Sequence, residues 1–365
     1  MKEWSSPWNS FNSTKALLWK EQLEGCANLD FLPPVTVDIN PSNICNYDCP
    51  WCNAYGFMQK DNGIISKEHL KRLADFFAEW GVQGVATVGG GEPLMNQAVP
   101  DFLQWLSNNK LEAGIITNGS LITDRIAEII AKTCRWAGIS VDAGSDETYK
   151  KTKGIKVNGK FDKVLDNIKL LCGQVKRLQT DCRVCYKYLL HPMNAKEILM
   201  AVRLAKELGV NDFHIRPVGW ENVTKTIGKP ALYYPEELLE EVDEQIAAAM
   251  ELEDDDFKIY GIRHKFAVNF DRRINFTKCR ATPLLIIIAP DGNCHLCVDL
   301  CGKENMILCS HYPDPHEILK YWNSDRHKEI LQNIDINKCP RCVIGPYNEI
   351  VEHVIMKDNM SKCFL

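Results

Sequence analysis

The chain has 365 residues, of which 45% are hydrophobic and 25% are charged, a balance typical of a globular protein with a large core. Its 43 basic and 48 acidic side chains give a net charge of −5, and no basic tract stands out, which argues against strong nonspecific binding to nucleic acid. The sequence has no apolar run of membrane-spanning length and no signal-peptide core at its start, so we expect a cytoplasmic protein. In that compartment the 16 cysteines are expected to bind metal or stay reduced.

Strands and helices are predicted to alternate along most of the chain. Residues 1–34 form an N-terminal extension with a short helix at 15–23, and residues 35–39 then alternate apolar and polar side chains as a strand does. Helical spacing is clearest at Phe161, Val164 and Ile168. Such alternation predicts parallel strands joined by right-handed crossovers. The further predicted strands are 84–88, 114–117, 136–141, 183–190 and 212–218.

Three closely spaced cysteines follow the first predicted strand. Cys45, Cys49 and Cys52 have the spacing C-x3-C-x2-C. Three thiolates can hold three irons of a cubane cluster and leave the fourth iron open to another molecule. A structural zinc site or three buried cysteines are the alternatives, but zinc prefers four protein ligands and the next candidate along the sequence is His69. The spacing therefore favours an iron–sulfur cluster with an open iron.

Polar and glycine-rich segments follow the next three predicted strands. They are Gly89-Gly90-Gly91-Glu92, Asn118-Gly119 and Asp142-Ala143-Gly144. The carboxyl ends of barrel strands are where chemistry gathers, and glycines let a backbone approach a ligand closely. Ser140 and Asp142 are two residues apart, so both are expected to point into the barrel. The simpler interpretations are a turn at the glycines, a turn at Asn118 and a helix cap at Asp142.

The cysteine motif, with an aromatic residue before its last cysteine, and the later Gly90-Gly91-Glu92 together resemble the radical SAM superfamily. The resemblance covers residues 35–220 and implies an α/β fold, a partial (β/α)6 TIM-like barrel. It also implies a [4Fe–4S] cluster on Cys45, Cys49 and Cys52, whose open iron chelates S-adenosylmethionine. In such enzymes an external donor such as flavodoxin or ferredoxin supplies an electron, and reductive cleavage gives a 5′-deoxyadenosyl radical that abstracts a substrate hydrogen.

The resemblance also assigns cofactor-binding roles. Glu92, with Gly90 and Gly91, would hold the methionine ammonium, and Asn118 would contact the adenosine. Ser140 and Asp142 would contact the ribose or the methionine carboxylate. Trp51 would pack near the adenine, or else is a core aromatic residue. Lys187 and Arg216 are candidates for the methionine carboxylate or for an acidic group of the substrate, whereas His191 and His214 are interpreted as structural.

A second cysteine set lies in the last third of the chain. The residues 284–289 and the turn at Asp291-Gly292 predict half of a hairpin, Cys297 follows it, and Cys339 and Cys342 form a C-x2-C pair. Together with Cys279 and a helix expected at 318–331, this pattern resembles the twitch module, a short form of the SPASM extension. It implies an auxiliary [4Fe–4S] cluster on Cys279, Cys297, Cys339 and Cys342.

Alternatives to this ligand set remain open. The same four thiolates could form a zinc site. Cys294 is the strongest rival to Cys297, and the remaining cysteines that could join the set are Cys301, Cys309 and Cys363. The longer SPASM pattern continues with a further cysteine where this chain has Asn348, so a second auxiliary cluster is not expected.

The expected domains are an N-terminal extension (1–34), the partial barrel (35–220), a linker and helix (221–270) and a small α+β auxiliary-cluster module (271–365). With one auxiliary cluster and a short extension, we expect an oxidoreductase or isomerase that oxidises or rearranges a small molecule such as a sugar, cyclitol or nucleoside. Modification of a peptide, modification of a nucleobase in nucleic acid, and a non-enzymatic scaffold are the alternatives. No catalytic residue is assigned; Tyr186, Glu221 and His264 are possibilities for a general base.

Overall fold

The computed structural model describes residues 12–55, 62–218, 235–261, 274–339 and 342–356. The strands are β1 (Thr36–Ile39), β2 (Gly84–Thr87), β3 (Glu112–Thr117), β4 (Cys134–Ser140), β5 (Arg183–Leu190), β6 (Asp212–Pro217), β7 (Lys258–Gly261), β8 (Leu285–Ile288), β9 (Asn293–His295) and β10 (Ile307–Ser310). Within these ranges they form one ten-stranded sheet in the order β10-β9-β8-β1-β2-β3-β4-β5-β6-β7.

The central strands form an open barrel. All neighbours from β1 to β7 are parallel, and the sheet curves into an arc whose ends, β7 and β10, do not pair with each other. The predicted partial barrel is thus confirmed, with all six expected strands present. The structure adds β7, which sequence analysis placed inside a linker and helix.

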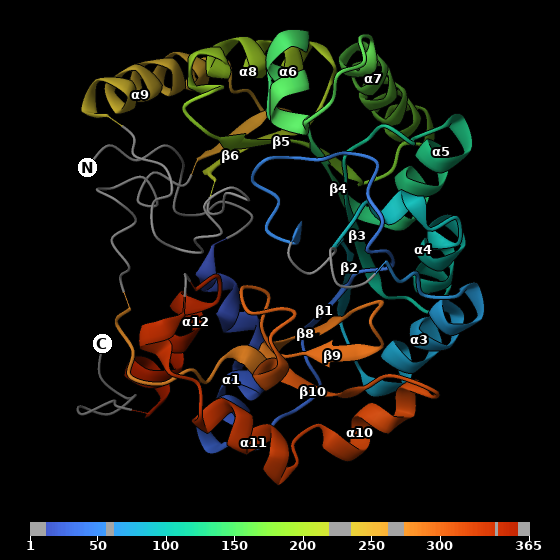
Figure 1. Ribbon diagram of the computed structural model, residues 1–365, viewed down its shortest axis with the longest axis vertical. Coiled ribbons are helices and arrows are strands. Elements are labelled where there is room, and N and C mark those ends of the chain that lie inside the picture. The colour runs from blue at the N-terminus through green and yellow to red at the C-terminus, as the bar shows by residue number, and fades with distance from the viewer. Residues whose placement is uncertain (1–11, 56–61, 219–234, 262–273, 340–341, 357–365) are drawn as a thin grey trace.

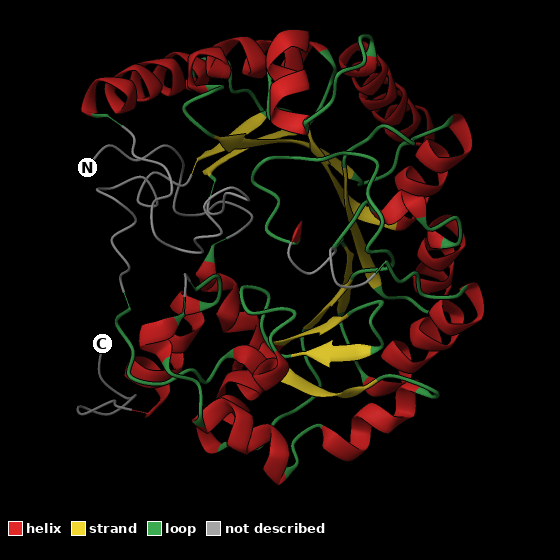
Figure 2. Ribbon diagram, in the orientation of Figure 1, coloured by secondary structure: helices red, strands yellow, loops and turns green. Residues whose placement is uncertain are grey.

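Helices cover the outer face of this arc (Figure 2). Their starts follow local chemistry, because the side chains of Ser66, Thr123 and Ser145 each accept a hydrogen bond from a backbone N–H in the first turn of the following helix. The helices are α1 (Lys20–Asn28), α3 (Lys67–Trp80), α4 (Val99–Asn108), α5 (Asp124–Thr133), α6 (Asp146–Lys153), α7 (Lys160–Leu178), α8 (Ile198–Glu207), α9 (Glu236–Met250), α10 (Ile318–Tyr321), α11 (Asp325–Gln332) and α12 (Gly345–Glu349).

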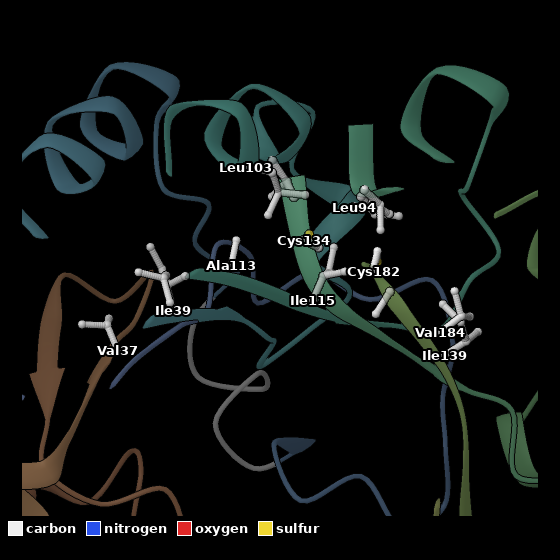
Figure 3. Packing of buried hydrophobic residues seen from close by; sticks show 14 of the residues in the cluster. Val37, Ile39, Leu94, Leu103, Ala113, Ile115, Cys134, Ile139, Cys182 and Val184 are labelled. Carbon is white, nitrogen blue, oxygen red and sulfur yellow. The ribbon is translucent and has the colours of Figure 1, made fainter. Parts of the chain in front are cut away.

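The apolar core lies between the strands and these helices. Val37, Ile39 and Ile115 are fully buried, and Figure 3 shows them on the helix-facing side of their strands. Because successive strand residues point to opposite faces, the residues between them face the inside of the barrel. There the indole of Trp136 lies across Gly114, where a Cβ would be 2.3 Å from the ring. A larger residue at position 114 would therefore displace Trp136.

The C-terminal segment extends the barrel sheet instead of forming a separate one. β8 pairs in parallel with β1, and β8 and β9 form the expected hairpin around Gly292, whose φ is +86°. The single helix expected at 318–331 is wrong, because the structure has α10 and α11 separated at Asn323, whose φ is +61°. The Ser324 side chain accepts from the His327 N–H and so begins α11 as a new helix.

A buried histidine pair fastens this C-terminal segment to α3. His311 Nε2 lies 2.9 Å from the carbonyl oxygen of Ala289, which can only accept, so this nitrogen carries the proton. His311 Nδ1 therefore accepts from His69 Nε2, 2.8 Å away. Burial lowers the pKa of His69 to about 4, so both rings are neutral near neutral pH. Within the described residues, no helix is long and apolar enough to cross a membrane.

Candidate active site

The loop after β1 crosses the inside of the arc (Figure 1). Its three predicted cysteines lie within electrostatic reach of one another. Cys45, Cys49 and Cys52 are half-buried, and the charge of each thiolate would repel the others. Burial raises the pKa of Cys49 to about 12 and that of Cys52 to about 11, so without a metal these thiols are protonated at neutral pH. Coordination to iron removes such a proton outright.

The glycine-rich segment after β2 packs against this cysteine loop. Gly91 N donates to Ser42 O at 2.9 Å, and Glu92 N donates to Ile44 O at 2.9 Å. A Cβ at Gly91 would lie 2.2 Å from Ile44 O, which no real contact allows. The glycines therefore allow this segment to pack closely against the cysteine loop. The interpretation of the glycines as a simple turn was incomplete, because it did not include this contact.

Glu92 is buried and connects β2 to β3. Its carboxylate accepts from Leu94 N at 3.1 Å, from Thr117 Oγ1 at 2.5 Å and from Asn118 N at 2.7 Å. Burial raises its pKa, although the three hydrogen bonds favour the charged form. A carboxylate offers about four acceptor positions, so one is left for a ligand ammonium.

Asn118 joins the end of β3 to the cysteine loop. Its Nδ2 donates to Asn46 Oδ1 at 2.8 Å, while its Oδ1 accepts from Ser120 Oγ at 2.6 Å. Asn46 in turn donates to Ser120 Oγ at 2.9 Å. This closed set of bonds holds three polar side chains in fixed positions beside the cysteines, and it is more than the local Asn-Gly turn that sequence analysis weighed.

Basic side chains from β5 and β6 face the inside of the barrel. Ser140 is the strand neighbour of Lys187, and Leu189 is the neighbour of Arg216. Lys187 Nζ lies 3.4 Å from His214 Nδ1. Burial and, to a smaller extent, the Arg216 charge lower the Lys187 pKa to about 8, so this wall of the barrel concentrates positive charge. Trp51 stacks on His191 with ring centroids 4.8 Å apart.

Asp142 is placed differently from the sequence expectation. β4 ends at Ser140, and Asp142 has the left-handed φ of +60°, so strand alternation does not extend to it. Its Oδ2 accepts from Lys153 Nζ at 2.6 Å and its Oδ1 accepts from Leu189 N at 2.6 Å. The helix-cap alternative is wrong, because Ser145 caps α6.

Two site residues were missed. Lys153 precedes Gly154 at the end of α6, where a lysine and a glycine usually mark only a solvent-exposed helix end, so no sequence signal pointed to it. Asp38, by contrast, could have been found from the alternation of β1, because it lies between buried Val37 and Ile39 and faces the barrel interior. Burial raises the pKa of Asp38 to about 7, and no described residue hydrogen-bonds to its carboxylate.

The members of the second cysteine set also lie within electrostatic reach of one another. The charges of Cys342, Cys297 and Cys339 would all repel that of Cys279, and burial raises the pKa of the Cys279 thiol. Cys294, the predicted rival, instead has Cys309 and Asp291 as its charged neighbours. Cys301 lies within electrostatic reach of Cys297 and Asp38. Cys363 is outside the described residues.

Asn348, at the position of the further SPASM cysteine, clamps this second set. It is fully buried, and its Oδ1 accepts from Arg280 N at 2.6 Å and from Ala281 N at 2.8 Å. Its Nδ2 donates to Cys342 Sγ at 4.0 Å. The amide thus ties the segment after Cys279 to α12.

No three His, Cys, Asp or Glu side chains among the described residues converge on a single metal ion. Of the three possible general bases, Tyr186 is fully buried and its hydroxyl donates to Ala143 O at 2.6 Å. Glu221 and His264 lie outside the described residues.

Fold and site define an open parallel α/β barrel with three cysteines at the carboxyl end of its first strand. The family model described as "Radical SAM superfamily" matches residues 39–205. Over these residues, just under half of the chain, the sequence is similar to the radical SAM superfamily, and this similarity supports a [4Fe–4S] cluster and S-adenosylmethionine as cofactors. The thiols of Cys45, Cys49 and Cys52 are the donor type that such a cluster takes.

Sequence relatives include a probable GTP 3′,8-cyclase of Saccharolobus islandicus, 26% identical over 307 residues, which are 80% of this chain and 89% of the relative. An AdoMet-dependent heme synthase of Methanosarcina barkeri is 27% identical over 172 residues, or 47% of each chain. Among solved structures, SuiB of Streptococcus suis bound to S-adenosylmethionine has a TM-score of 0.65 at 16% identity, covering 92% of this chain and 76% of SuiB. AnSMEcpe with bound AdoMet has a TM-score of 0.57 at 16% identity, covering 82% and 83%.

Proposed function

We propose that this radical SAM enzyme oxidises a small molecule that carries an anionic group and binds inside the barrel. The observation that carries the proposal is the basic wall formed by Lys187 and Arg216, which faces the interior from β5 and β6. An anion bound there gains from charge pairing in a largely buried site. The relative named a probable GTP 3′,8-cyclase agrees with a small anionic substrate such as a nucleotide.

Cys45, Cys49 and Cys52 are the proposed ligands of the first cluster. When bound, the cluster and S-adenosylmethionine supply the radical that abstracts a substrate hydrogen. Glu92 uses its remaining acceptor position for the methionine ammonium, beside the backbone of Gly90 and Gly91. Asn118 and Ser140 line the proposed path of the nucleoside, whereas Asp142 contributes through Lys153 and not by direct contact.

We further propose that Cys279, Cys297, Cys339 and Cys342 hold an auxiliary [4Fe–4S] cluster. A second electron-transfer centre is what a net two-electron oxidation needs, so oxidation is favoured over redox-neutral rearrangement. Oxidation of an alcohol to a carbonyl also releases a proton from the substrate. Asp38 faces the barrel interior with a pKa of about 7, which suits a group that accepts that proton near neutral pH.

The experiment is an anaerobic incubation of the reconstituted protein with dithionite, S-adenosylmethionine and deuterated candidate substrates. We expect deuterium in 5′-deoxyadenosine from a nucleoside or sugar phosphate, and at least about tenfold less from the same compound without its phosphate. Transfer from peptides alone would overturn the substrate class and favour peptide modification. Absence of 5′-deoxyadenosine with both clusters loaded would favour the non-enzymatic scaffold.

A further inference from the structure

A buried ion pair lies next to the three-cysteine loop. Lys153 Nζ and Asp142 Oδ2 are 2.6 Å apart, and each side chain is only 2% exposed. Burial alone would lower the pKa of Lys153, but the negative groups around it, Asp142 first among them, together raise it, so Lys153 is a cation at neutral pH. Taking two charges out of water is costly, and this cost can cancel the attraction between them, so a buried ion pair is weak evidence for a role in stability.

The positive end of this pair acts on the cysteines. Cys49 lies within electrostatic reach of both members of the pair, and the Lys153 cation acts on it more strongly than the Asp142 carboxylate does. The Lys153 charge also reaches Cys45 and Glu92. The pair therefore presents a net positive field to the three-cysteine site.

Backbone contacts fix this cation relative to the loop. Asp48 N, between two of the cysteines, donates to Lys153 O at 3.1 Å. Gly154 has a φ of +63°, and a Cβ there would lie 1.9 Å from Asp48 O, so only glycine allows the approach. Tyr149 on α6 also donates to the Tyr47 hydroxyl at 3.2 Å. The end of α6 and the cysteine loop are thus held as one unit.

We propose that Lys153 is a positioning residue for the radical SAM cluster, a fixed buried cation that offsets the negative charge of the three thiolates and of the electron added on reduction. Asp142 orients this cation and partly screens it. The proposal rests on the proposed ligands Cys45, Cys49 and Cys52. It predicts that the cluster is easier to reduce with Lys153 than without it.

The test measures the midpoint potential of each cluster by a redox titration followed by electron paramagnetic resonance, without substrate. Lys153→Met should disfavour reduction of the three-cysteine cluster on the order of tenfold, because a unit charge within about 10 Å has an effect of this size at an effective dielectric constant near 20. Tenfold corresponds to ~59 mV for one electron. Asp142→Asn should shift the same potential in the opposite direction, and the auxiliary cluster should keep its potential in both.

Lys151→Met is the matched control, because Lys151 lies on the same helix with its side chain 55% exposed. It should leave both potentials unchanged. If Lys153→Met prevents cluster loading, Lys153→Arg is the deciding variant. Restored loading and a restored midpoint potential in Lys153→Arg would support the role of a positive charge at this position, whereas loss of the cluster in both variants would overturn the proposal. Shifts of the same sign in Lys153→Met and Asp142→Asn, or no shift, would also overturn it. Because no readout involves substrate turnover, these outcomes are independent of the proposed substrate class.

Discussion

Replacing Asp38 with asparagine tests the half-buried acid in the barrel interior. The Asp38 pKa is about 7 in the folded protein, against an ordinary value of 3.8. Between these values the folded state keeps a proton that the unfolded state has lost, so the wild-type protein loses stability as pH rises through this window. Three pKa units at about 1.36 kcal/mol each give at most about 4 kcal/mol. Asparagine does not titrate and avoids this loss.

The assay compares apparent melting temperatures of the wild-type protein and Asp38→Asn at pH 5 to 8, at one scan rate. With an unfolding entropy of roughly 2.1 cal/mol/K per residue, 4 kcal/mol corresponds to about 5 °C in a chain of 365 residues. The range from pH 5 to pH 8 crosses about two of these three pKa units, so the variant should gain about 3–4 °C at pH 8 relative to pH 5. Asp181→Asn, whose side chain is 89% exposed, should show no such trend. A pH-independent difference for Asp38→Asn would refute the reasoning.

The contacts of both cysteine sets lead to three further predictions. Gly91→Ala should lower the iron content by about four irons per chain and slow formation of 5′-deoxyadenosine by at least about 100-fold, because its Cβ would lie 2.2 Å from the cysteine loop. Gly84→Ala is the control, because the nearest atom to its Cβ would be 3.6 Å away, and it should keep the iron content and the rate of the wild-type protein. Asn348→Ala should lower the free energy of unfolding in denaturant by about 2–5 kcal/mol, because two backbone N–H groups lose their acceptor; an unchanged midpoint would contradict this role. Cys342→Ala should remove about four irons by chemical analysis and Cys309→Ala none, and equal iron contents would argue against the chosen set.

Local pattern was enough to predict the barrel. β5 has the same limits in the structure as in the sequence prediction, because its apolar and aromatic residues, interrupted by Lys187, stop before His191 and Pro192. β7 was missed, because four residues between a helix and an undescribed segment carry no clear period and depend on pairing with β6. The break between α10 and α11 was missed because both halves continue one apolar stripe, while the polar residues at the break decide the backbone.

The candidate site was predictable only where spacing carries the chemistry. The cysteines of both sets could be chosen from their motifs and the expected fold, and in the structure the members of each set lie within electrostatic reach of one another. Asp142 and Lys153 could not be paired in advance, because their contact depends on a left-handed residue after β4 and on the end of α6 turning inward. The clamping role of Asn348 likewise needs the fold, because its partners are 67 and 68 residues away.

The parallel pairing of β8 with β1 has a consequence for anyone who shortens this chain. A fragment ending before residue 271 would leave the β1 backbone groups that now bond to β8 without partners. Unpaired edge strands of this kind can pair with strands of other chains and cause aggregation. Insolubility of such a fragment would therefore report a lost neighbour in the sheet, and it would be no measure of whether the first cluster can assemble alone.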